Sequence, residues 1–127
     1  MTFLRCFSTL GCPDFSLGGA LALAAKHGLG GIELRALDGT VELPAYLAAQ
    51  FGSPEGLADR LRGSPVRVVS LDASLPLAGG TEGEREALLA FLPWAEALGV
   101  RWLRVFDGRG QGDDAGAIAA AAETVRW

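Results

Sequence analysis

The sequence has little of what several classes of protein need. It holds one histidine, one lysine and two cysteines among 127 residues, and its formal net charge is −4. A nucleic-acid surface needs clustered positive charge that displaces counterions, and no basic run is present, so we expect no nucleic-acid partner. No apolar run approaches the roughly 18 residues of a membrane span, so we expect no membrane partner either.

The amino-terminal residues also lack the pattern of a secretory signal, which is a basic region followed by a long apolar core. We therefore expect a cytoplasmic location. In a reducing compartment Cys6 and Cys12 are expected to be free thiols, with a disulfide between them as the alternative. His27 precedes a helix-ending glycine, so we assign it no catalytic role, and without a suitable histidine base Cys12 is not expected to act as a nucleophile.

Apolar and small residues are abundant, and their order predicts alternating strands and helices. Half of the sequence is hydrophobic, 18 residues are glycine and the mean hydropathy is +0.28, which is typical of a globular chain. Short apolar runs predict strands at 3–9, 31–36, 66–72 and 101–107. Their spacing of about 30 residues is the size of one βα unit, and no linker interrupts it. We therefore predict a single domain over residues 1–127 with a parallel sheet.

Capping residues place helices between these strands. Thr81 and Glu84 predict a capping box at the start of a helix. Pro93 lies inside this predicted helix and should kink it. Gly28 and Gly99 each end a helix just before a strand. The first predicted helix runs from Ser16 to Lys26, and a short helical turn is predicted at 44–50. A further helix starts at Ser53, another runs from Thr81 to about Leu98, and the last begins after a cap at Asp113 or Asp114.

Charged residues inside the strands distinguish a barrel from an open sheet. Because side chains alternate along a strand, Glu33 and Arg35 share one face, and Arg104 shares its face with Trp102 and Phe106. Isolated charges beneath a layer of helices would be unfavourable, whereas charges that face a barrel interior can pair with one another. We therefore predict the strand order 1-2-3-4, with helices on the outer face and these charges on the concave face. A doubly wound sheet with helices on both faces is the alternative.

Four strand–helix units are half of a TIM-type barrel, which needs eight strands and typically about 250 residues. The fold class that we predict is accordingly α/β, a parallel (β/α)4 half of such a barrel. Its first and fourth strands would be exposed parallel edges, which proteins seldom leave bare. We expect these edges to be covered in a homodimer or by a C-terminal half-barrel.

Three phrases of the sequence carry a resemblance to a known family. They are Ser8-Thr9-Leu10-Gly11-Cys12-Pro13, Gly31-Ile32-Glu33-Leu34-Arg35 and Leu103-Arg104-Val105-Phe106. Together they resemble the sugar phosphate isomerase/epimerase family of xylose isomerase-like TIM barrels, over the N-terminal half of that barrel only. The resemblance implies a small sugar or polyol as substrate, isomerisation or epimerisation beside a carbonyl, and a divalent Mn²⁺, Mg²⁺ or Zn²⁺ ion in the full barrel.

The same resemblance implies that the metal ligands and the catalytic glutamates lie on the last four strands of the family barrel. This chain has no counterpart of those strands, so no catalytic residue and no metal ligand is carried over, and we expect little or no activity from the 127 residues alone. The related DNA-repair endonucleases carry histidines at the ends of strands three and four, where this sequence has Ser70-Leu71-Asp72 and Phe106-Asp107. A non-catalytic remnant, or a module that binds a small ligand or a partner, is the alternative function.

Five residues are candidates for substrate contact, because they lie on the predicted concave face or at carboxyl-terminal strand ends: Glu33, Arg35, Asp72, Arg104 and Asp107. A purely structural role remains open for each, as an ion pair inside the barrel or as a cap on a loop. The glycine-rich stretch at 108–114 resembles a dinucleotide loop. Its spacing is G-x-G-x-G rather than G-x-G-x-x-G, so we predict a plain loop.

We predict that the 127-residue chain binds no catalytic metal ion tightly, because no ligand set is carried over from the family. Calorimetric titration with Mn²⁺ and with Zn²⁺ measures this. A stoichiometric site of micromolar affinity or tighter would contradict the prediction and would direct attention to Asp72, Asp107 and Glu33.

Overall fold

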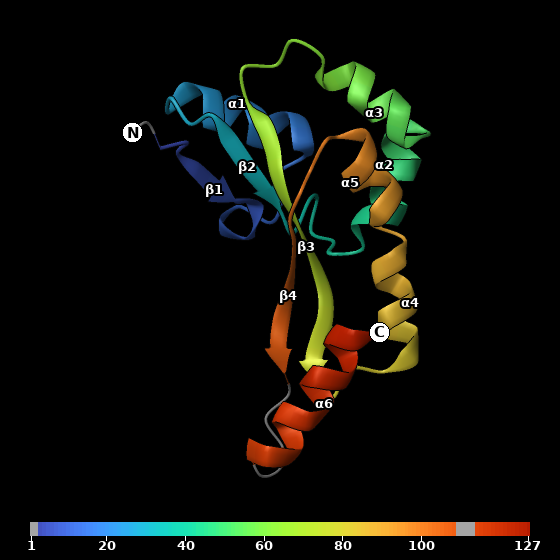
Figure 1. The fold of residues 1–127 in the computed structure, drawn as a ribbon. Coiled ribbons are helices and arrows are strands. Elements are labelled where there is room, and N and C mark those ends of the chain that lie inside the picture. The colour runs from blue at the N-terminus through green and yellow to red at the C-terminus, as the bar shows by residue number, and fades with distance from the viewer. Residues whose placement is uncertain (1–2, 109–113) are drawn as a thin grey trace.

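A curved sheet of four parallel strands organises the protein (Figure 1). The structure, a computed structural model, describes residues 3–108 and 114–127. The strands are adjacent in chain order, which confirms the predicted order 1-2-3-4. They are β1 (Cys6–Ser8), β2 (Gly31–Leu34), β3 (Arg67–Ala78) and β4 (Leu103–Gly108).

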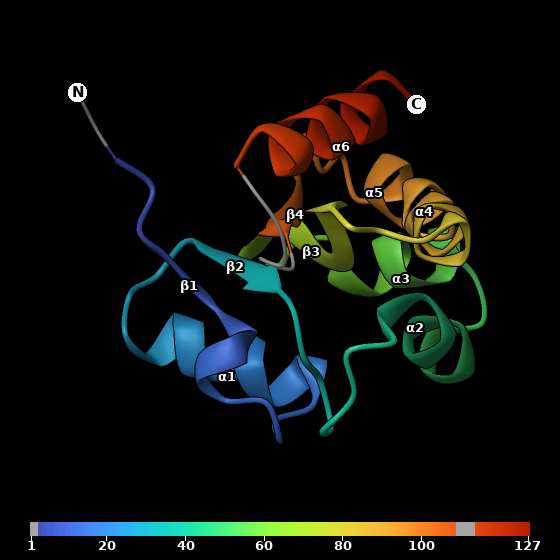
Figure 2. The ribbon, with the colours of Figure 1, turned by 90° about the horizontal axis from the view of Figure 1, so that it is seen from below.

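The helices lie on the outer side of this sheet. Viewed along the strands in Figure 2, they follow an arc around the convex side and leave the concave side open, which excludes the doubly wound alternative for the described residues. They are η1 (Thr9–Gly11), α1 (Leu17–Lys26), α2 (Leu43–Phe51), α3 (Pro54–Leu61), α4 (Glu82–Leu89), α5 (Leu92–Ala97) and α6 (Asp114–Arg126). None of the helices within the described ranges is long and apolar enough to cross a membrane.

The helix starts predicted at Ser16, Ser53 and Thr81 form as their capping residues indicate. The hydroxyl oxygens of Ser16 and Ser53 each accept the N–H of the residue three positions on, at 3.1 Å. Thr81 and Glu84 make the full capping box. Asp114 is the first residue of α6 and supplies an acid in its first turn, whereas Asp113 lies outside the described residues.

The single helix predicted from Thr81 to Leu98 is wrong, because the segment forms two helices. In a continuous helix the ring of Pro93 would clash with the carbonyl of Leu89, four residues earlier. α4 ends at Leu89, and Pro93 lies in the first turn of α5, where its missing N–H has no helical partner to lose. The proline therefore separates two helices instead of kinking one.

The end predicted for the third strand is also wrong. β3 continues past Asp72 to Ala78 and pairs with β4 through a register shift between Asp72 and Pro76. A proline is tolerated within a strand at such an irregularity, where no ladder hydrogen bond needs its N–H. Asp72 therefore lies inside β3 rather than at its carboxyl end.

The hydrophobic core fills the space between the sheet and the helix arc. Ile32 and Leu34 of β2 are fully buried on the outer face, while Glu33 between them faces the concave side. Fully burying each such aliphatic side chain contributes about 1.5–3 kcal/mol. The same cluster takes leucines and a tryptophan from the helices, among them Leu17, Leu47, Leu57 and Trp94.

Gly31 is a position of close packing at the start of β2. An added Cβ would lie 2.7 Å from Cys6 Sγ and 2.7 Å from Val69 Cγ1. We predict that Gly31→Ala lowers the free energy of unfolding by about 1–3 kcal/mol, because these neighbours must shift. Urea unfolding measures this, with Gly11→Ala as the control, since nothing lies within 4 Å of the Cβ added there. Equal effects of the two substitutions would contradict the prediction.

Candidate functional site

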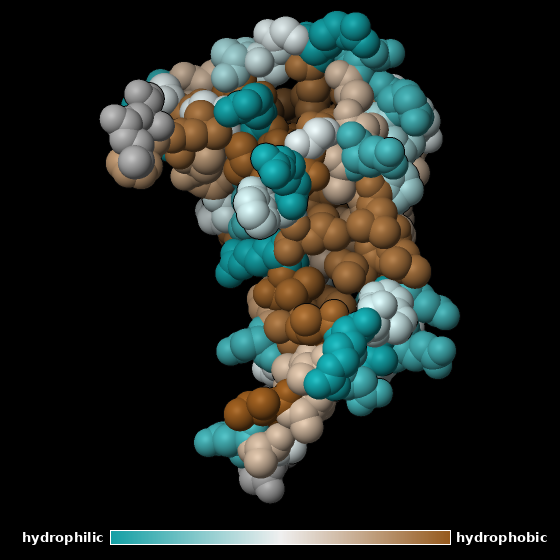
Figure 3. All heavy atoms as spheres, in the orientation of Figure 1, coloured by the Kyte–Doolittle hydropathy of each residue, from teal (hydrophilic) through white to brown (hydrophobic). Residues whose placement is uncertain are grey.

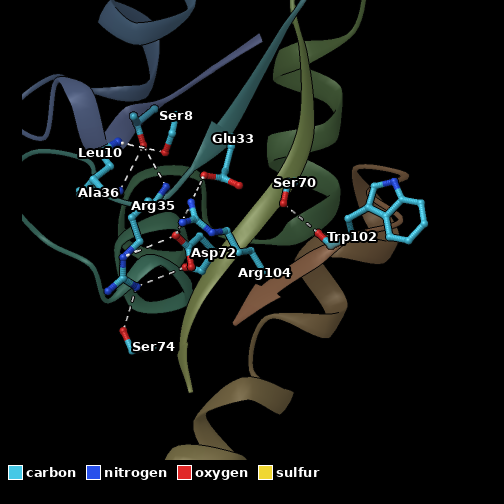
Figure 4. A network of polar contacts seen from close by, with 11 residues as sticks. Ser8, Leu10, Glu33, Arg35, Ala36, Ser70, Asp72, Ser74, Trp102 and Arg104 are labelled. Carbon is cyan, nitrogen blue, oxygen red and sulfur yellow. Dashed lines mark hydrogen bonds and ion pairs between the residues drawn. The ribbon is translucent and has the colours of Figure 1, made fainter. Parts of the chain in front are cut away.

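Four charged side chains meet on the concave face of the sheet (Figure 4). They are Glu33 of β2, Arg35 just after β2, Asp72 of β3 and Arg104 of β4, and we call them the concave cluster. Arg104 Nη1 donates a hydrogen bond to Glu33 Oε1 at 3.1 Å and lies 3.6 Å from Asp72 Oδ2. Arg35 Nε lies 3.8 Å from the same Asp72 oxygen. The predicted placement of Glu33, Arg35 and Arg104 on one face is confirmed, and their contact with a substrate stays a prediction.

Asp72 is the buried centre of this cluster. Its side chain is 0% exposed, and neither carboxylate oxygen has a hydrogen-bond partner within the described part of the chain. Burial raises the pKa of Asp72, the guanidinium groups of Arg35 and Arg104 lower it, and Glu33 raises it again, with a net shift upward. The carboxylate thus serves as the shared counter-ion of two arginines, and burial makes its ionised form less favourable than it is in water.

Arg35 is held on several sides. Its Nη1 donates to Ser74 Oγ at 2.9 Å and to the carbonyl oxygen of Asp72 at 3.4 Å. Its guanidinium carbon lies 5.0 Å from the centre of the Phe106 ring, within the range of a cation–π interaction. The Arg35 side chain is only 13% exposed, so little of its guanidinium group is open to solvent.

Arg104 is the accessible cation of the cluster. Its side chain is 51% exposed, compared with 18% for its partner Glu33. Apart from the bond from Nη1 to Glu33, its guanidinium makes no hydrogen bond to a residue that the structure describes. Arg104 therefore offers N–H donors toward the open side of the sheet.

Thr9 positions the segment that carries Arg35. It is fully buried in η1, directly after β1, and its Oγ1 accepts the backbone N–H groups of Arg35 at 2.9 Å and Ala36 at 3.1 Å. Sequence reasoning assigned no role to Thr9 or to Ser74. The signal for Thr9 was a small polar residue at a strand end, whereas Ser74 was missed because β3 was predicted to stop before it.

The loop after β2 is fixed by a second polar contact. Tyr46 of α2 donates its hydroxyl hydrogen to Asp38 Oδ2 at 2.6 Å, and burial together with this carboxylate raises the pKa of Tyr46 to about 12. Asp38 has a φ of +47°, a left-handed conformation that aspartate adopts more readily than most residues. The contact holds the loop at the end of the sheet where Arg35 leaves β2.

Asp107, the fifth predicted site residue, is not brought into the cluster. It alternates along β4 with Phe106, so it falls on the other face of the strand, and it is exposed. Its Oδ1 accepts the N–H of Gly108 at 2.9 Å, which is a local contact. The structure thus assembles four of the five candidates and leaves Asp107 outside.

The concave cluster does not fit a divalent metal ion. Within residues 3–108 and 114–127, no three histidine, cysteine, aspartate or glutamate side chains are arranged to hold one. The Glu33 and Asp72 carboxylates each lie beside a guanidinium group, whose positive charge would repel a cation. We therefore assign no metal-dependent step to these residues.

One cavity in the described part of the chain lies away from the concave cluster. It has a volume of about 620 Å³ and is lined by residues near the amino-terminal ends of β3 and β4, including Arg67, Arg101 and Trp102. The carboxyl-terminal ends of the strands are where barrel enzymes place their chemistry. The cluster, on the open concave face, is therefore the better candidate site.

These features define a class of protein: four parallel strands with outer helices and a charged concave face form half of a TIM-type barrel. Among solved structures, the chain is similar to the IolI protein, in a crystal structure with a binding zinc atom, at 22% sequence identity and a TM-score of 0.68. The alignment covers 98% of this chain and 47% of the IolI chain, and it shows the fold. No family model matches the sequence, and no curated protein matches it either.

The raised pKa of Asp72 predicts the direction of a pH dependence. The folded state binds the proton of the Asp72 carboxyl group more tightly than the unfolded state does. The stability that protonated Asp72 contributes is therefore complete below the ordinary pKa of 3.8, and it is lost as the pH rises through the higher pKa of the folded state. We predict that the stability of the wild type relative to Asp72→Asn falls across this window, as measured by urea unfolding at a series of pH values.

Asp107→Asn is the matched control for this measurement, because its exposed carboxylate lies outside the cluster. We expect it to leave the pH dependence unchanged. A wild type that gains stability over Asp72→Asn as the pH rises would mean that the two guanidinium groups outweigh burial, and would contradict the prediction.

Proposed function

We propose that this chain supplies the N-terminal half of a sugar phosphate isomerase/epimerase-like barrel and binds a small sugar or polyol against its concave face. The observation that carries the proposal is the concave cluster, which gathers donors and acceptors on the inner face of a half-barrel. The three sequence phrases that resemble the family support it, and two of them contain Glu33, Arg35 and Arg104.

The chemistry of the cluster suits a polyhydroxylated ligand. The planar guanidinium of Arg104 has N–H groups in a fixed fork that matches pairs of hydroxyl or phosphate oxygens. Glu33, partly exposed beside it, is an acceptor for a sugar hydroxyl. Phe106, at 36% exposed, adds an apolar ring on the same face, against which the C–H side of a sugar packs.

In this proposal the chain binds and orients the substrate and does not carry the proton transfer. Isomerisation beside a carbonyl needs a base and an acid within hydrogen-bond reach of the reacting carbons. The family resemblance places those glutamates, and the divalent ion that polarises the substrate oxygens, on strands that have no counterpart here. Arg104 would hold negatively charged or hydroxyl oxygens of the substrate, while Asp72 keeps Arg104 and Arg35 in position.

We predict that the chain binds sugar phosphates through Arg104. Saturation-transfer NMR with fructose 6-phosphate, xylose and a cyclic polyol measures binding, and Arg104→Gln is expected to weaken it about tenfold, equivalent to about 1.4 kcal/mol. Arg101→Gln is the control, because Arg101 is exposed and lies outside the cluster.

The outcomes separate the proposed function from its alternatives. Binding that Arg101→Gln weakens as much as Arg104→Gln would place the ligand elsewhere and contradict the proposal. If none of the three ligands binds, the alternative of a non-catalytic remnant without this function is favoured. Sugar binding without turnover in the presence of Zn²⁺ or Mn²⁺ is the expected result for the chain alone.

A further inference from the structure

We propose that Glu33 is the specificity-determining residue of the concave cluster. Its carboxylate, bonded to Arg104, makes the site bind an uncharged sugar or polyol in preference to the phosphate ester of the same sugar. This inference rests on the proposed function, because it concerns the ligand that the concave face would take. It goes beyond that function by assigning the preferred charge of the ligand to one side chain.

Glu33 and Arg104 form a donor–acceptor pair that a ligand can reach. Arg104 Nη1 donates to Glu33 Oε1 at 3.1 Å, and the two side chains point toward each other from β4 and β2 (Figure 4). Both keep part of their surface exposed, Arg104 more than Glu33. A ligand that approaches the open N–H groups of Arg104 therefore comes close to the Glu33 carboxylate as well.

The other two members of the cluster are less accessible to a ligand. Asp72 is fully buried, and both of its carboxylate oxygens are closed to solvent. Arg35 is mostly buried and donates to Ser74. Arg104 is accordingly the cation, and Glu33 the carboxylate, that a ligand meets on the concave face.

The charges of the cluster balance one another. Its two guanidinium groups and its two carboxylates sum to zero when all four are ionised. A sugar hydroxyl needs no net positive charge in its site, whereas a phosphate monoester carries about −1.5 to −2 charges at neutral pH. The cluster therefore offers a phosphate group no excess of positive charge.

A phosphate group held by Arg104 would lie close to the Glu33 carboxylate. Two groups that accept hydrogen bonds of about 2.9 Å from one planar guanidinium lie within about 8 Å of each other, which is the Debye length at physiological ionic strength. Dissolved ions therefore screen their repulsion only in part. Figure 3 shows a broad hydrophobic band over β4 and the surface beside it, and such surroundings strengthen the repulsion between two anions.

An uncharged polyol uses the same pair without this repulsion. Of two neighbouring sugar hydroxyls, one can accept an N–H of Arg104 while the other donates to an oxygen of Glu33. Both hydrogen bonds involve a charged group, and such bonds are roughly twice as strong as bonds between neutral groups. The Glu33 carboxylate thus favours the hydroxylated ligand and disfavours the phosphorylated one.

Binding of fructose and of fructose 6-phosphate tests the proposal, because the two ligands differ only by the phosphate group. NMR titration of the isotope-labelled chain gives both dissociation constants. We expect the wild type to bind fructose about threefold more tightly than fructose 6-phosphate. In Glu33→Gln the amide still accepts a hydrogen bond but carries no charge. We expect this variant to bind fructose 6-phosphate about tenfold more tightly than the wild type does, and fructose about threefold more weakly.

Two further variants control for charge and for shape. Asp107→Asn also removes one negative charge, but from an exposed carboxylate outside the cluster. We expect it to change the ratio of the two dissociation constants by less than about twofold. Glu33→Asp keeps the negative charge at this position, and we expect it to retain the preference for fructose.

Ionic strength separates the effect of the Glu33 charge from an effect of its shape. At about 1 M salt the Debye length falls to about 3 Å, so repulsion across the guanidinium is largely screened. We expect the gain of Glu33→Gln in binding fructose 6-phosphate to shrink under this condition, while its loss in binding fructose persists. A gain that high salt leaves unchanged would contradict the proposal.

The outcomes also separate this proposal from the proposed function. If both ligands bind and Glu33→Gln leaves the ratio of dissociation constants as in the wild type, or shifts it toward fructose, the proposal is overturned while sugar binding stands. A wild type that binds fructose 6-phosphate as tightly as fructose, or more tightly, overturns it without any variant. If neither ligand binds, the proposed function fails and this proposal fails with it. Circular dichroism shows that each variant is folded.

Discussion

The buried carboxylate of Asp72 is the group on which the concave face depends. It lies inside β3, at 0% exposure, between the guanidinium groups of Arg35 and Arg104. Burial of a charge is unfavourable unless opposite charges lie close by, and here two of them do. The same carboxylate therefore explains why two arginines, Arg35 just after β2 and Arg104 in β4, occupy the inner face of the sheet.

The one-sided helix layer is the second constraint, and it follows from the sheet. Ile32 and Leu34 need a hydrophobic covering, which the helices provide, whereas Glu33 between them needs a polar surrounding. Side chains alternate along a strand, so one short strand can meet both needs only if its two faces differ. A sheet covered on both faces would bury Glu33 and Arg104 beneath apolar helices.

Residues outside the strands complete the site by fixing the backbone. Thr9 holds the N–H groups of Arg35 and Ala36, and the bond from Tyr46 to Asp38 holds the loop that follows. Ser74 and Phe106 then restrict the Arg35 side chain. Arg104, in contrast, keeps half of its surface exposed, so the cluster combines one restrained arginine with one accessible arginine.

The sequence by itself determined the class of fold, the strand order, the helix caps and the placement of three charged residues on one face. These are consequences of local rules, namely side-chain alternation, capping chemistry and the spacing of βα units. Only the tertiary structure decided that Asp72 lies within β3 and that α4 and α5 are separate helices. The length of β3 depends on its pairing with β4, which lies far away in the chain. A proline can either kink a helix or separate two helices, and the surrounding packing decides which of the two occurs. The residues of one strand or one helix alone do not specify its distant pairing partners or the packing around it.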